Sequence, residues 1–94
     1  MLVYFIEISI GQWEDKYDFT YKELYFTSLD QAERVKAILD TINQVWVDII
    51  LDDNFKDSGT EGFKPLINLD SRFAYGGWYE VPSISIFKKH ITII

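Results

Sequence analysis

The chain has 94 residues, of which 48% are hydrophobic, 17% aromatic and 26% charged, and it contains no cysteine. This composition predicts one globular domain over residues 1–94, and it excludes an intrinsically disordered chain, a disulfide framework and a thiolate metal site. The net charge is −6, and residues 1–53 alone carry eleven acids and four bases, which argues against direct binding to a nucleic-acid backbone because such binding needs a basic face.

Residues 2–10 (LVYFIEISI) are predicted to form the first strand. Alternation places five apolar side chains on one face: Leu2, Tyr4, Ile6, Ile8 and Ile10. Val3 and Phe5 make the start of the opposite face apolar too, which predicts a strand inside the sheet, covered on both sides over its first half. The segment lacks the basic start and cleavage site of a signal peptide, and no apolar run reaches the roughly 18 residues of a membrane span. We therefore expect a cytoplasmic protein without a membrane anchor.

Residues 11–18 (GQWEDKYD) have the Gly and Asp content of a loop, and residues 19–27 (FTYKELYFT) are predicted to form the second strand of an antiparallel hairpin. In this strand Phe19, Tyr21 and Tyr25 are expected to share one face.

Residues 28–44 predict an amphipathic helix. Ser28 is suited to cap its first turn, and Gln31 completes the S-x-x-Q form of a capping box. Residues 45–51 (VWVDIIL) continue the apolar stripe but also suit a strand, because they are apolar on nearly all sides and rich in β-branched residues. A continuous helix is the favoured reading.

Residues 54–69 are predicted to be a loop, because glycines and Pro65 interrupt them. Residues 73–81 predict one strand or two short strands around Gly76–Gly77. Residues 83–94 predict a last strand or two, placed next to the first strand. The expected fold is α+β, an antiparallel sheet of about four strands with one dominant helix on one face, in the order β-β-α-loop-β-β.

No motif for catalysis or for a cofactor is present. His90, the only histidine, follows Lys88 and Lys89, which disfavour a bound cation. A calcium loop starting at Asp52 fails, because Lys56 and Asp57 occupy positions five and six, where an oxygen ligand and Gly are required. We expect neither enzymatic activity nor a cofactor or metal.

Aromatic residues in loops are the strongest departure from an ordinary domain. They either fold back over the sheet as part of a small core, or anchor a binding surface. In the second case a basic partner protein is expected to meet acidic and aromatic side chains of the hairpin loop: Trp13, Glu14, Asp15, Tyr17 and Asp18. A second candidate patch for such a partner consists of Asp48, Asp52 and Asp53.

An alternative function is binding or sequestering a small molecule such as a signalling nucleotide. Aromatic side chains would stack on the ligand and basic ones would meet its phosphates: Arg72, Tyr75, Trp78, Tyr79, Lys88 and Lys89. A third reading is a structural protein that forms a homodimer or larger assembly through an exposed strand edge.

In size, acidity, absence of cysteine and its strand–strand–helix opening (LVYFIEISI, FTYKELYFT, SLDQAERVKAILDTI), the chain resembles the small acidic anti-defence proteins of phages and mobile elements, the anti-CRISPR inhibitors among them. The resemblance is one of type, and it transfers no residue roles. It implies a stoichiometric inhibitor that occludes a nucleic-acid-binding surface of its target or locks the target's conformation.

Overall fold

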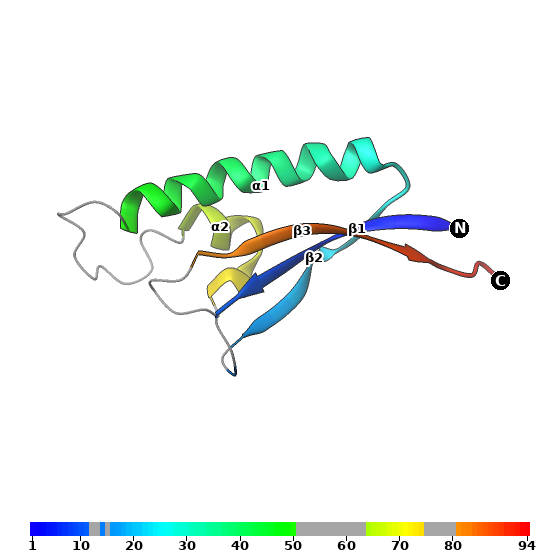
Figure 1. Ribbon diagram of the computed structural model, residues 1–94, viewed down its shortest axis with the longest axis horizontal. Coiled ribbons are helices and arrows are strands. Elements are labelled where there is room, and N and C mark those ends of the chain that lie inside the picture. Colours follow the sequence, from blue (N-terminus) through cyan, green and yellow to red (C-terminus); the bar gives the residue numbers. More distant parts are fainter. Residues whose placement is uncertain (12–13, 15, 51–63, 75–80) are drawn as a thin grey trace.

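The computed structural model describes residues 1–11, 14, 16–50, 64–74 and 81–94 (Figure 1). The elements follow in this order: β1 (Leu2–Ile10), β2 (Tyr17–Phe26), α1 (Leu29–Ile50), α2 (Lys64–Leu69), the 3-10 helix η3 (Ser71–Ala74) and β3 (Ser83–His90). The strands form an antiparallel sheet in the order β2-β1-β3. The predicted α+β fold, with one long helix on an antiparallel sheet, is confirmed.

Strand β1 is the central strand of the sheet and pairs with both neighbours. Its register with β3 runs without a break from Leu2 opposite His90 to Ser9 opposite Ser83. The N-terminal amine and carbonyl of Met1 extend this ladder by bonding Ile91 at 2.8 Å each. The prediction that the C-terminal strand lies beside an internal first strand is thus confirmed.

Helix α1 is continuous over 22 residues, about 33 Å at the usual rise per residue. Its start is the predicted one, because the Ser28 hydroxyl accepts from the backbone N–H of Gln31 at 3.4 Å. It does not break after residue 44, because Trp46 lies seven residues after the buried Leu39, on the same side of the helix, and is 1% exposed. Burial of an indole adds about 3 kcal/mol or more, which favours helix over strand here.

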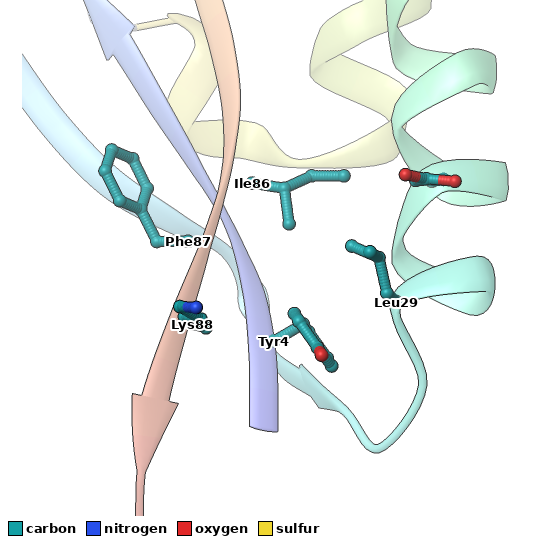
Figure 2. Close-up of a pocket in the computed structure, with 6 residues that line it drawn as sticks. Tyr4, Leu29, Ile86, Phe87 and Lys88 are labelled. Atoms are coloured by element: carbon teal, nitrogen blue, oxygen red, sulfur yellow. The ribbon is translucent and has the colours of Figure 1, made fainter. Parts of the chain in front are cut away.

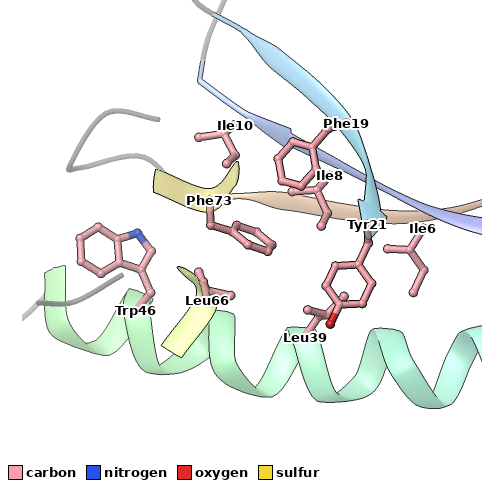
Figure 3. Close-up of a cluster of buried hydrophobic side chains, with 9 residues drawn as sticks. All are labelled: Ile6, Ile8, Ile10, Phe19, Tyr21, Leu39, Trp46, Leu66 and Phe73. Atoms are coloured by element: carbon pink, nitrogen blue, oxygen red, sulfur yellow. The ribbon is translucent and has the colours of Figure 1, made fainter. Parts of the chain in front are cut away.

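The core lies between α1 and one face of the sheet, and α2 and η3 close it on the side of β2 (Figures 1 and 3). The buried side chains come from every layer: Ile6, Ile8, Ile10, Phe19, Tyr21, Leu39, Trp46, Leu66 and Phe73. Three of them continue the predicted alternation of β1. All described helices therefore lie on one face of the sheet.

Two predictions about the second half of the chain are wrong. The sheet of the described residues has three strands, not about four, because Phe73 points into the core from a 3-10 helix and does not begin a strand. Residues 64–69 are a helix, not a loop. Pro65 is compatible with a helical first turn, where its missing N–H has no intrahelical acceptor, and Leu66 is fully buried. The turn predicted at Gly76–Gly77 lies outside the described residues.

Strand β2 contains an irregularity that changes which face its side chains occupy. Phe5 pairs with Tyr25, but Glu7, two residues on, pairs with Thr20, so four residues of β2 oppose Ile6 alone. Within this bulge Lys22 and Glu23 have positive φ angles of 49° and 54°. Tyr21 consequently faces the core whereas Tyr25 faces the opposite side of the sheet, and the expectation that they share a face is wrong.

Candidate functional site

The face of the sheet opposite α1 carries three aromatic side chains, one from each strand: Tyr25, Phe5 and Phe87. We call them the aromatic row. Phe5 stacks on Phe87 with ring centroids 5.8 Å apart and meets Tyr25 edge-on at 6.1 Å. Tyr25 and Phe87 are 49% and 47% exposed, and no described helix covers this face. Exposed neighbouring rings are typical of a protein-binding surface, because they offer large area at low entropic cost.

Acidic side chains lie beside the aromatic row, toward the β1–β2 hairpin. Glu7 shares the face of Phe5, two residues away, and its carboxylate has no ion pair among the described residues. Next along the face, the Ser9 hydroxyl donates a hydrogen bond to Asp18, whose carboxylate lies 3.7 Å from the Lys16 ammonium. Glu14, in the hairpin connection, is exposed.

The other members of the predicted partner-binding site fall elsewhere. Tyr17 is half-buried, and its ring packs on Phe19 at 5.4 Å, so it supports the core. Asp48 is exposed near the end of α1 and accepts a 2.9 Å bond from the Gln44 amide. The remaining predicted residues lie outside the described ones: Trp13, Asp15, Asp52 and Asp53.

The described members of the alternative ligand-binding set lie at opposite edges of the sheet. Arg72 lies at the outer edge of β2, whereas Lys88 and Lys89 lie on β3, at the opposite edge of the sheet. The three aromatic residues of that set, Tyr75, Trp78 and Tyr79, lie outside the described residues.

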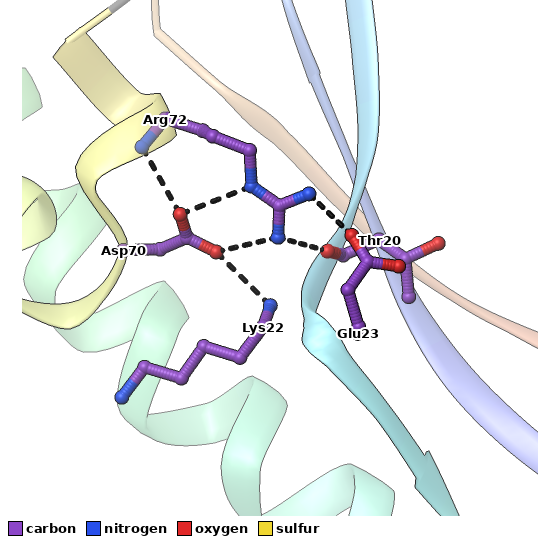
Figure 4. Close-up of polar contacts among 5 residues, drawn as sticks. All are labelled: Thr20, Lys22, Glu23, Asp70 and Arg72. Carbon is purple, nitrogen blue, oxygen red and sulfur yellow. Dashed lines mark hydrogen bonds and ion pairs between the residues drawn. The ribbon is translucent and has the colours of Figure 1, made fainter.

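Arg72 instead joins the segment after α2 to the bulge of β2 (Figure 4). Its guanidinium donates to the Asp70 carboxylate at 2.9 and 3.1 Å, to the Thr20 carbonyl and to the Glu23 carboxylate. Asp70 also accepts from the backbone N–H groups of Lys22 and Arg72, each at 3.0 Å. We call this network the Asp70–Arg72 clamp. It supplies the partners that the bulged backbone lacks within the sheet.

The clamp sets the charge state of its members. Burial raises the pKa of Asp70, which is 8% exposed, but the hydrogen bonds from Arg72 and from the Lys22 backbone outweigh burial, and the pKa lies below its ordinary value of 3.8. The hydrogen bond to Asp70, and then that to Glu23, raise the pKa of Arg72 above its usual range. Asp70 and Arg72 therefore both stay charged near neutral pH, and this pair is suited to holding structure.

The outer edge of β3 presents a different arrangement. Met1 and Ile91 exchange both of their backbone hydrogen bonds, so the antiparallel alternation directs the backbone groups of Phe87 and Lys89 toward β1. The N–H and C=O groups of Ile86 and Lys88 point outward. Among the described residues, no strand other than β1 pairs with β3.

A pocket of about 520 Å³ lies between the start of α1 and strands β1 and β3. Ile86, Tyr4 and Leu29 point into the space between helix and strands, while Phe87 points to the other side (Figure 2). Glu33 and Lys88 add one charge of each sign to its lining. Apolar walls with few polar groups are usual for ligand sites, but nothing in this lining is arranged for proton or group transfer.

Charge is nearly balanced over the described residues, which hold nine carboxylates and eight lysines or arginines, whereas the rest of the chain holds six carboxylates and one lysine. The described residues hold no cluster of three potential metal ligands. No helix within them is long and apolar enough to cross a membrane.

Two features were missed by reasoning from the sequence. The aromatic row became visible only with the strand register, because its three members are 20 and 62 residues apart in the chain. The Asp70–Arg72 clamp has one signature in the sequence, the Asp-x-Arg spacing at residues 70–72. An aspartate can accept a hydrogen bond from the backbone N–H two residues on, and here it also accepts from the guanidinium.

Comparisons with protein-family models, with curated proteins and with solved structures gave no match.

Proposed function

We propose that this chain is a non-enzymatic protein-binding inhibitor. It docks on its target through the face of the sheet opposite α1, which carries the aromatic row and which we call the open face. The observation that carries the proposal is the aromatic row, in which Tyr25 and Phe87 are about half exposed. Rings already ordered by stacking lose little entropy when a partner covers them. Interfaces draw most of their affinity from such anchors.

The partner we propose is a basic protein. The chain has a net charge of −6, and Glu7, Glu14 and Asp18 place carboxylates on the hairpin side of the aromatic row. Carboxylates on one side of an apolar centre raise the association rate with a basic partner and disfavour acidic ones. A target whose own function is to bind nucleic acid fits this chemistry, in keeping with the anti-defence proteins that the chain resembles.

The test is affinity capture with tagged protein from the cell that encodes it, comparing three single variants. Tyr25→Ala should weaken capture of a stoichiometric partner by about 10- to 100-fold, as for an interface anchor. Glu7→Lys should weaken it most at low salt. Ile38→Ala is the matched control, because Ile38 is 57% exposed on α1, away from this face.

Circular dichroism would verify that each variant remains folded. Capture of the same partner by the native protein, Tyr25→Ala and Glu7→Lys alike would contradict the proposed surface. Absence of any partner at low salt would contradict the inhibitor function itself.

The pocket beside Lys88 favours the second candidate function, binding of a small anionic molecule. A ligand there would place its apolar part against Leu29 and Ile86 and its charge on the ammonium group. Native mass spectrometry of the purified protein should then show a bound mass that Lys88→Glu abolishes. A spectrum with the bare chain alone would rule out a co-purifying ligand.

A further inference from the structure

We propose that the outer edge of β3 is a second interaction surface, which accepts an extended acidic segment of another protein as an added strand. This inference goes beyond the proposed function, because it uses another part of the sheet and a partner of opposite charge. Three independent features of the described residues lead to it: free backbone groups, unpaired cations and a neighbouring pocket.

The backbone supplies the first feature. Because Ile86 and Lys88 direct their N–H and C=O groups away from β1, the edge offers a row of unused donors and acceptors. An extended segment can satisfy them by forming one more rung of the ladder, as in other β-augmentation complexes. Strand β3 is regular over Ser83–His90, so no bulge prevents this pairing.

The side chains supply the second feature. A carboxylate lies within 4 Å of the charged groups of Lys16, Arg34, Lys36 and Arg72. Lys88 and Lys89 have no such partner among the described residues, and alternation places one ammonium on each side of β3. The edge therefore repels basic or identical strands and attracts one with carboxylates on both of its faces.

The pocket supplies the third feature. It lies on the helix side of β3, lined by Ile86, Lys88 and Leu29 (Figure 2). A side chain of the added strand that points to the helix side would lie next to this pocket. The segment that fits best alternates β-branched residues and carries adjacent carboxylates where it pairs with Lys88 and Lys89.

The probes are blocked heptapeptides of alternating Thr and Val that carry an Asp-Glu pair near one end or the other. The control peptides carry Asn-Gln or Lys-Lys in place of this pair. Titration into the ¹⁵N-labelled full chain at low salt would be followed by amide chemical shifts. The acidic peptides should shift the amides of Ile86, Lys88 and His90 most. They should bind about fivefold more tightly than the Asn-Gln peptides, as expected for two exposed ion pairs.

The double variant Lys88→Glu/Lys89→Glu should reverse the order, so that the Lys-Lys peptides bind best. Lys16→Glu is the matched control, because it makes the same substitution at the hairpin and should preserve the preference for acid. Equal affinity of the acidic and Asn-Gln peptides, shifts away from β3, or no shift with any peptide would overturn the proposal. So would sedimentation of the free chain as a dimer that the double variant abolishes, since a second copy would then occupy the edge.

These outcomes are distinct from those of the proposed function. Tyr25→Ala and Glu7→Lys leave β3 unchanged, so failure of the aromatic row as an interface would leave the peptide preference intact. Loss of the peptide preference would likewise leave capture by the open face intact.

Discussion

Strands β2 and β3 flank the same central strand, yet their outer edges differ. The edge of β2 is interrupted by the bulge at Lys22 and Glu23, and the Asp70–Arg72 clamp bonds to the exposed backbone there. The edge of β3 has no bulge, and among the described residues only the charges of Lys88 and Lys89 oppose the addition of a basic strand there. A clamped edge cannot accept another strand without breaking native bonds, whereas a charged edge excludes some strands and admits others. The difference locates the capacity for strand addition on β3.

The largest expected effect comes from removing the clamp. Asp70→Ala leaves Arg72 and the Lys22 N–H without their acceptor, so the free energy of unfolding should fall by about 2–4 kcal/mol. Urea denaturation would measure it. Asp40→Ala is the control, since Asp40 forms an exposed pair with Lys36, and it should cost about 0.5 kcal/mol or less. Equal losses in the two variants would show that the clamp contributes nothing beyond a surface pair.

Acid should weaken the contribution of the same clamp to the free energy of unfolding. Because the folded-state pKa of Asp70 is lowered, its contribution to stability is complete above the unfolded pKa of about 3.9 and is lost as the pH falls through the folded value. The stability difference between the native protein and Asp70→Asn should therefore be constant near neutral pH and shrink below about pH 4. Urea denaturation across this range measures it. A difference that grows in acid would contradict the assigned charge state.

Glycine substitutions should have small effects of opposite sign on the two edges. Lys22→Gly relieves a left-handed conformation that costs a non-glycine residue about 1 kcal/mol, offset in part by losing the ammonium contact with the Tyr21 ring. We expect a gain of about 0.5 kcal/mol in unfolding free energy. Lys88→Gly, in a regular strand, should lose about 0.5–1 kcal/mol. Loss of stability in both variants would contradict the backbone geometry of the bulge.

The parts of the fold that the sequence predicted are those in which one local pattern sufficed. The buried residues Ala32, Leu39 and Trp46 recur at helical spacing on one side of α1. The burial of Trp46 favours a helix that continues to Ile50. The alternation of Ile6, Ile8 and Ile10 likewise predicted β1, and the apolar Val3 and Phe5 on its other face predicted its central place in the sheet. In both cases the local preference and the tertiary contacts agree.

The parts that could not be predicted depend on contacts between distant residues. Neither Lys22 nor Glu23 is a residue type that favours positive φ, so the bulge has no local signature; Asp70 and Arg72, about 50 residues later, hold it in place. A prediction without the bulge assigns Tyr25 to the face of Tyr21, so it does not place Tyr25 in the aromatic row. The predicted acidic site stays a prediction: Glu14, Asp18 and Asp48 are exposed, and the other acids of that site lie outside the described residues.

Hydrogen exchange of the backbone amides in the free protein tests the contrast between the two edges most directly. Along β3 the exchange rates should alternate, with Phe87 and Lys89 protected by their bonds to β1 and Ile86 and Lys88 exchanging as open amides. On β2, the amide of Lys22 should be protected although it points away from β1, because Asp70 accepts its hydrogen bond. Uniform protection along β3, or rapid exchange at Lys22, would contradict the account of one clamped and one open edge.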